Sequence, residues 1–277
     1  DWVCTTTRNL VREMKLGNAS AWAPYVNYLK SQPYGQLPSH WSEPARELLD
    51  EVVGDPSNPI LPPSDPSGWI DDEWKNECDG GDDLFEQNAF LLVTQRGWDD
   101  LLIPVYDMMS HRNGKWLNTR SLGVRNEVVE VQAKKAIRAG EEIYTSYDQC
   151  EDCGGRADSY GTPEIFRDYG FTEIYPQRWH FHDQGISFVL DANDDNGLEL
   201  EWLSAEPDED EIEFFEGQAE RLRELMDGKL SIYNEGISQS EQLAIREFTD
   251  AMITAMDTMI TIVKGMDCTS GEDTCIV

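Results

Sequence analysis

Residues 139–148 read Ala-Gly-Glu-Glu-Ile-Tyr-Thr-Ser-Tyr-Asp, and residues 168–171 read Asp-Tyr-Gly-Phe. These two stretches decide how the rest of the chain is interpreted. A Gly-containing turn precedes an alternation of apolar and polar side chains at residues 143–147, which predicts a short strand. On their own, Tyr144 and Tyr147 would be ordinary members of a half-buried strand. The surrounding sequence decides whether the tyrosines have a structural or a functional role.

The middle of the chain has the pattern of short strands joined by loops. Residues 127–133 alternate as a strand does, and residues 186–190 form another strand candidate. Residues 101–105 are a short apolar run. Because no regular helices separate these segments, the pattern differs from a series of βαβ units.

Helical patterns flank this β-rich middle. Apolar residues recur at helical spacing in three N-terminal segments, 6–31, 43–53 and 84–95. In the C-terminal third, an acidic helix opens at Pro207 and ends at Gly228, and a capping box from Ser238 to Glu241 starts another. The last helix has a Met-rich face, which indicates packing onto the preceding helix, with a partner-binding surface as the alternative. The sequence therefore predicts an α+β fold.

Three segments together resemble SET-domain proteins of the Rubisco lysine methyltransferase-like family. The first, at 88–96, is similar to a family helix that ends in a Ser-Arg pair. The second, at 102–111, is similar to the family pattern I-P-x-x-D-x-x-N-H, with Ser110 where the family has Asn. The third is the pair of stretches at 139–148 and 168–171, which is similar to the family's G-E-x-x-x-x-x-Y-D and Y-G-F.

The resemblance implies that S-adenosylmethionine is the cofactor and that a lysine amine accepts its methyl group. Tyr147 is then the catalytic residue, and Tyr169 shapes the same narrow tunnel for the lysine. The residues implied to bind the cofactor are Arg96, Asp107, Ser110 and His111. In the family the Arg contacts the cofactor carboxylate, which suits a guanidinium fork. Ser110 offers one hydrogen-bond donor where the family's Asn offers two.

An architecture follows from the same resemblance. It consists of a helical insert at 1–100, a SET core at 101–190, and a helical region at 191–277 that resembles a shortened substrate-binding domain. In the family, two strands with a Gly-x-Gly turn precede the insert, whereas this chain begins at the insert, with Trp22 and Tyr25 similar to its Trp-x-x-Tyr. We therefore expect the N-terminal SET strands to be absent, and an upstream segment or a partner chain to cover the open sheet edge.

The charge of the chain restricts its partners. With 54 acidic and 22 basic residues, the net charge is −32, so nucleic acid and anionic membrane surfaces are disfavoured as direct partners. A basic or Lys-rich protein is the natural complement, although the acidic residues are also consistent with solvated loops. No run of roughly eighteen apolar residues occurs, so we expect no membrane span.

The six cysteines leave several possibilities open. Two pairs lie close in sequence, Cys150 with Cys153 and Cys268 with Cys275. Disulfides are possible in fifteen full pairings, and sequence alone selects none of them. Cys4 and Cys78 are equally compatible with reduced thiols in a core. Together with the sequon at Asn18, the cysteines favour the secretory pathway or an extracellular location, with plastid, cytoplasm or nucleus as alternatives.

A metal site is not expected from the sequence. Cys150 and Cys153 form a C-x-x-C, which can be half of a zinc site, but no second ligand pair at suitable spacing follows it. A local disulfide or free thiols are therefore favoured there. His180 and His182 share a strand face, and a zinc role for them is the weaker alternative.

Two functions remain from the sequence. The first is a protein-lysine N-methyltransferase, supported by Arg96, His111, Tyr147 and Tyr169 occurring in the family's order. The second is a non-catalytic SET-like binding or scaffold protein, braced by disulfides, which Ser110 and the absent N-terminal strands favour. The substrate, the methylation state and the oligomeric state stay open.

Overall fold

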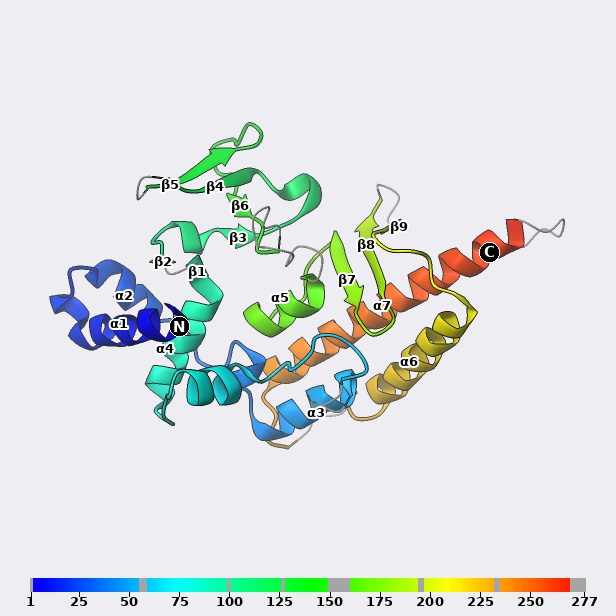
Figure 1. Cartoon of the computed structure of the whole chain (residues 1–277), viewed down its shortest axis with the longest axis horizontal. Helices are drawn as coiled ribbons and strands as arrows, with labels where there is room; N and C mark the ends of the chain where they lie inside the picture. Colours follow the sequence, from blue (N-terminus) through cyan, green and yellow to red (C-terminus); the bar gives the residue numbers. More distant parts are fainter. Residues whose placement is uncertain are drawn as a thin grey trace.

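The computed structural model describes residues 2–54, 59–98, 101–125, 128–148, 160–193, 197–231 and 235–269. Its helices are α1 (Trp2–Leu16), α2 (Ala23–Lys30), α3 (Glu43–Val53), α4 (Leu84–Arg96), α5 (Thr162–Tyr169), α6 (Glu209–Asp227) and α7 (Gln239–Thr269). Its strands are β1 (Gly97–Trp98), β2 (Leu101–Leu102), β3 (Ser110–His111), β4 (Thr119–Arg125), β5 (Val128–Ala133), β6 (Tyr144–Thr145), β7 (Gln177–Phe181), β8 (Ile186–Ala192) and β9 (Leu198–Trp202). Helices α1, α2 and α4 gather at one end, α6 and α7 at the other, and small sheets lie between them (Figure 1). The mixture of helices and short strands agrees with the predicted α+β class.

The largest hydrophobic core joins α3, α5, β7, β8, α6 and α7. Phe166 of α5 stacks on Phe248 of α7 with the ring centroids 4.1 Å apart, and Trp179 of β7 lies 6.2 Å from the same Phe248 ring. All three side chains are fully buried. Truncating a buried aromatic of this kind costs about 3–5 kcal/mol, so this cluster fixes α5 firmly against the C-terminal helices.

Helix α7 confirms two predictions from the sequence. The Ser238 N–H donates to Glu241 Oε2 at 2.7 Å and the Glu241 N–H donates to Ser238 Oγ at 3.3 Å, which is the predicted capping box. Met252, Met256 and Met259 are buried in the main core, so the Met-rich face packs inside the molecule. Along the described residues, no helix combines the length and apolar character that a membrane crossing requires.

The N-terminal helices form a separate packing unit around α4, braced by a disulfide. Residues of α1, α2 and α4 share one hydrophobic cluster. Cys4 of α1 is bonded to Cys78, which follows the π-helical segment Trp69–Glu77. The alternative of reduced thiols at these two positions was therefore wrong. The pairings of Cys150 with Cys153 and of Cys268 with Cys275 involve side chains outside the described part of the chain.

The small sheets bring distant segments together. Strands β7, β8 and β9 form an antiparallel sheet, and β4 pairs with β5. Strand β3 pairs with β6 in parallel, which sets Ser110 beside Tyr144 and His111 beside Thr145. The apolar run at 101–105 gives only the two-residue strand β2, because Pro104 has no N–H to donate and Val105 has a φ of 76°.

The Cys4–Cys78 bond predicts a reductant-dependent stability. It closes a loop with a sequence separation of 74 residues, and a loop of that length corresponds to about 4 kcal/mol by the chain-entropy relation. We expect the Cys4→Ser/Cys78→Ser variant to unfold in urea with a free energy lower by about this amount. Wild type with reductant should match the variant, and equal stability of oxidised wild type and variant would contradict the pairing.

Candidate functional site

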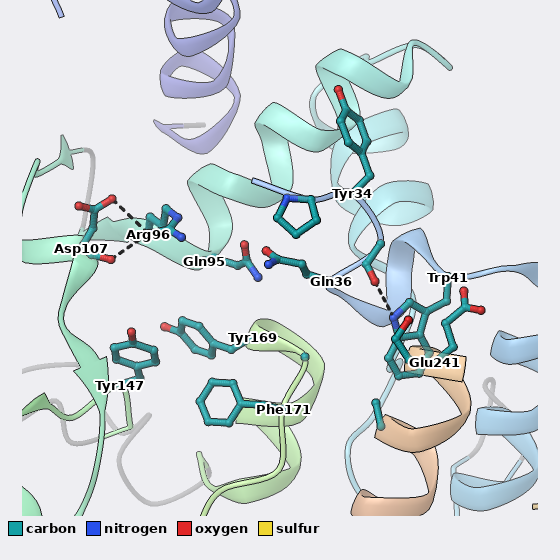
Figure 2. Close-up of a pocket in the computed structure, with 15 residues that line it drawn as sticks. Tyr34, Gln36, Trp41, Gln95, Arg96, Asp107, Tyr147, Tyr169, Phe171 and Glu241 are labelled. Carbon is teal, nitrogen blue, oxygen red and sulfur yellow. Dashed lines mark hydrogen bonds and ion pairs between the residues drawn. The ribbon is translucent and has the colours of Figure 1, made fainter. Parts of the chain in front are cut away.

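The larger of two adjoining cavities has a volume of about 580 Å³. Arg96 and Asp107 lie at one end of it, and the rings of Tyr147 and Tyr169 lie beside them (Figure 2). The loop at 33–41 and the first turn of α7 line the opposite end. The structure therefore brings four of the six predicted site residues into one cavity.

The smaller cavity, of about 340 Å³, contains the other two predicted residues. Ser110 and His111 line it together with Arg112 and Thr172. Tyr147 and Phe171 line both cavities, so the two cavities adjoin at these residues.

Tyr147 follows β6, and both the ring and the hydroxyl of its side chain make defined contacts. Its ring lies 4.5 Å from the ring of Tyr169 with an interplanar angle of 31°, and its hydroxyl donates to the carbonyl oxygen of Met109 at 2.6 Å. Burial raises the pKa of Tyr147 to about 12. The phenol is therefore protonated at neutral pH, where it can position a ligand but does not act as a general base.

The backbone conformation of Gly170 explains why the Tyr-Gly-Phe stretch has a glycine at its centre. This residue ends α5 with a φ of 78°, in the left-handed region that favours glycine. A Cβ at this position would lie 2.0 Å from the carbonyl oxygen of Gln36. Only glycine allows this close approach, which brings the loop at 33–41 against α5 and closes one side of the larger cavity.

Arg96 and Asp107 form a buried ionic pair inside the larger cavity. Arg96 Nη1 donates to the carbonyl oxygen of Asp107 at 2.9 Å and lies 3.6 Å from Asp107 Oδ2. The Tyr25 hydroxyl donates to the same Oδ2 at 2.6 Å, and the Tyr28 ring lies 5.5 Å from the Arg96 guanidinium. Burial raises the pKa of Asp107, and the hydrogen bonds from Tyr25 and Arg96 oppose that rise.

Two atoms of this pair lack partners. Arg96 Nε and Asp107 Oδ1 are buried, and neither has a hydrogen-bond partner among the described residues. A buried polar atom left in this state costs about 1–3 kcal/mol. Because both atoms are buried, a ligand with a carboxylate and an ammonium group could pair with them only after the Arg96 and Asp107 side chains turned toward the cavity.

Ser110 and His111 are held by glutamates. The Ser110 hydroxyl donates to Glu142, in a short contact at the surface. His111 lies inside, where its Nε2 is 2.6 Å from Glu173 Oε1 and its Nδ1 accepts the Tyr147 N–H at 2.9 Å. The Ser110 hydroxyl could donate to a cofactor only after leaving Glu142, whereas its oxygen can accept a hydrogen bond where it stands.

A buried polar network lies behind Tyr147. The Asn113 amide donates to Asp148 Oδ2 at 2.9 Å and to Glu173 Oε1 at 3.0 Å, and Ser146 donates to Asp148 Oδ1 at 2.6 Å. Ligand atoms of His111, Asp148 and Glu173 lie within 4.8 Å of one another, a spacing that a metal ion could use. The Asn113 amide already joins the two carboxylates, so they have donors without a cation.

Tyr25, Asn113 and Glu173 are site residues that the sequence did not reveal. Tyr25 was noted only as part of a resemblance in the helical insert, yet it contacts Asp107 across a separation of 82 residues. Glu173 stands two positions after Phe171. Its place beside the Tyr-Gly-Phe stretch is the one signal that pointed to it.

No protein-family model matches the chain, and no curated protein or solved structure matches it either. The resemblance to SET-domain methyltransferases therefore stays a prediction from sequence motifs. The function has to be inferred from the side chains of the two cavities.

The Tyr25–Asp107 hydrogen bond predicts a pH-dependent loss of stability in a Tyr25→Phe variant. The raised pKa means that ionised Asp107 destabilises the fold, and this effect declines as the pH falls through the folded-state pKa and is absent below the ordinary pKa of the unfolded chain. Removing the donor should raise the pKa further. We expect the free energy of unfolding to fall by about 1–3 kcal/mol at neutral pH and by less in mild acid.

Urea unfolding of Tyr25→Phe at several pH values measures this effect. Tyr28→Phe is the matched control, since it keeps the ring beside Arg96. A deficit that grows as the pH falls, or an equal deficit in the control, would contradict the assignment.

Proposed function

We propose that the chain is a protein-lysine N-methyltransferase that uses S-adenosylmethionine. The observation that carries the proposal is that the two cavities adjoin at Tyr147 and Phe171, which line both of them. Methyl transfer needs a donor and an acceptor that meet in line at one point. Two cavities that adjoin at the same pair of aromatic rings can hold a donor and an acceptor that meet there.

The larger cavity has the chemistry that a lysine side chain requires. The rings of Tyr147 and Tyr169 offer apolar faces to the aliphatic stem and favour a cation beside them. The Tyr147 phenol oxygen and the Met109 carbonyl oxygen lie 2.6 Å apart and can orient the amine. Because the phenol is protonated, we expect the amine to lose its proton to solvent.

The unpartnered atoms of Arg96 and Asp107 support the cofactor assignment. S-adenosylmethionine supplies an electrophilic methyl group on a sulfonium and carries a carboxylate and an ammonium at its amino-acid end. Arg96 Nε has no acceptor and Asp107 Oδ1 no donor among the described residues, so they could serve the first and the second group once the two buried side chains turn toward the cavity. Ser110 and His111, in the smaller cavity, would contact the remainder.

The net charge of −32 supports a basic protein as the acceptor. Long-range attraction between a Lys-rich segment and an acidic surface raises the rate of encounter and falls as salt is added. We therefore expect the preferred acceptor to be a Lys-rich segment of another protein.

A non-catalytic SET-like binding protein is the second candidate. It is favoured by the hydroxyl of Ser110, which bonds to Glu142, and by the Arg96 guanidinium, which already pairs with Asp107. On this alternative the two cavities bind a ligand or a partner without transferring a group.

Calorimetric titration with S-adenosylmethionine and S-adenosylhomocysteine tests the cofactor assignment. We expect both to bind, and Arg96→Met to weaken both by roughly 10- to 100-fold, since one charged hydrogen bond is lost. An absence of binding at millimolar ligand would overturn the enzyme proposal and favour the second candidate.

A Tyr147→Phe variant tests the role of the phenol. With Lys-rich proteins as acceptors and a labelled methyl donor, we expect turnover to fall by about 100-fold, a loss typical of removing one positioned hydrogen-bonding group. The control is Tyr144→Phe, because the Tyr144 hydroxyl contacts Glu142 outside both cavities. Full activity of Tyr147→Phe would remove Tyr147 from the catalytic role.

A further inference from the structure

Three separate segments of the chain meet behind Tyr147. They are the β3 segment with His111 and Asn113, the segment 146–148, and the segment that contains Glu173. Each segment also contributes a residue to the two cavities. The contacts among them are buried and polar, so their geometry decides where Tyr147 lies.

We infer that Glu173 is a positioning residue that selects the protonated nitrogen of His111 and, through His111, fixes the backbone of Tyr147. The side chain of Glu173 is fully buried and that of His111 is 4% exposed. The inference concerns how Tyr147 is held. Only its consequence for turnover rests on the proposed function.

The hydrogen-bond directions define the state of His111. The Tyr147 N–H can only donate, so His111 Nδ1, at 2.9 Å, must accept and carries no proton. Nε2 then holds the single ring proton and donates it to Glu173 Oε1 at 2.6 Å. His111 is therefore a neutral imidazole with its proton on Nε2.

Glu173 fits an ionised carboxylate that only accepts. Its Oε1 also receives the Asn113 amide at 3.0 Å, and its Oε2 receives the Thr162 hydroxyl. Three donors therefore converge on one side chain. Burial raises the pKa of Glu173, and the hydrogen bond from His111 opposes the rise. Without the Glu173 acceptor, the Nε2 proton would lose its hydrogen-bond partner, and the tautomer with the proton on Nε2 would no longer be favoured.

The alternative tautomer is incompatible with the observed backbone. A proton on Nδ1 would face the Tyr147 N–H, leaving that amide unpaired at a cost of about 1–3 kcal/mol. The Tyr147 backbone would then move away, and its phenol would leave Met109. Residues Ser146 and Asp148, held through Asn113, would resist that movement only in part.

Asp148 supplies a matched comparison. Like Glu173 it is a buried carboxylate that accepts from Asn113, yet no hydrogen bond joins it to His111 in the described residues. If the network acted only as general support, removing either carboxylate, by Asp148→Leu or by Glu173→Met, would have similar effects. If Glu173 selects the tautomer, only a substitution that removes the Glu173 acceptor should change which nitrogen of His111 is protonated.

The test uses the full chain labelled with nitrogen-15 in histidine and long-range proton–nitrogen correlation spectra. The chain has four histidines, and His111→Gln identifies the signals of His111. We expect wild type to show a protonated Nε2 and an unprotonated Nδ1 at neutral pH. Glu173→Gln should keep this pattern because its amide oxygen can still accept, and Asp148→Leu should keep it too.

Glu173→Met should instead give a mixture of both tautomers and a displaced Tyr147 amide signal. If that variant does not fold, wild type and Glu173→Gln still decide the matter. A protonated Nδ1 in either would overturn the inference, as would a tautomer shift in Asp148→Leu. A change in the His111 signals when a chelator is added would also overturn it, since the cluster would then hold a metal.

Turnover separates this inference from the proposed function. In an active enzyme, Glu173→Met should lower kcat on the order of 10- to 100-fold with little change in KM, because Tyr147 is misplaced. Glu173→Gln should restore most of the rate. Absence of methyl transfer in wild type would reject the proposed function and leave the tautomer result standing, whereas full activity of Glu173→Met would reject the positioning role alone.

Discussion

The hydrogen bond between His111 and Glu173 is the interaction on which the candidate site depends. It lies in the interior, where an unpaired carboxylate would be strongly destabilising. Asn113 and Thr162 complete the set of donors, so the carboxylate is stable only when the segments that carry His111, Asn113 and Thr162 are in place. Tyr147, whose N–H donates to His111, lines both cavities together with Phe171. The site is therefore assembled by polar contacts, while the hydrophobic core holds α5 and the C-terminal helices around it.

Hydrophobic packing and the disulfide stabilise the part of the site that contains Arg96. Helix α4 is buried through most of its length and presents Arg96 at its end, where Asp107 receives it. The Cys4–Cys78 bond braces the helices that pack on α4. Residues that line the larger cavity come both from the end of α4 and from α5 and α7. Gly170 permits the close contact of α5 with the loop at 33–41, because any side chain there would meet the Gln36 carbonyl.

Local signals in the sequence predicted local structure well. Helix α3 begins with Pro44 in its first turn as expected, and the capping box of α7 forms as expected. The same Glu241 also accepts the Ser42 N–H across 199 residues, which no local pattern encodes. Tyr25, Glu173 and the Cys4–Cys78 pairing escaped prediction for the same reason. Each depends on which distant segments meet, and that is decided by packing rather than by propensity. The motif residues Arg96, Asp107, Ser110, His111, Tyr147 and Tyr169 could be identified from the sequence, because each is recognised from its neighbours in a short segment.

The ion pair of Arg96 and Asp107 bears on ligand binding in the larger cavity, which both candidate functions require. The pair neutralises two buried charges, yet within the described part of the chain it leaves one donor and one acceptor unpartnered. A protein that needed the pair only for stability would gain by pairing those atoms internally, or by replacing both residues with apolar ones of similar volume. A ligand with a carboxylate and an ammonium group could pair with these buried atoms if both side chains turned toward the cavity. Such pairing would recover on binding the stability that the unpaired atoms cost the free protein.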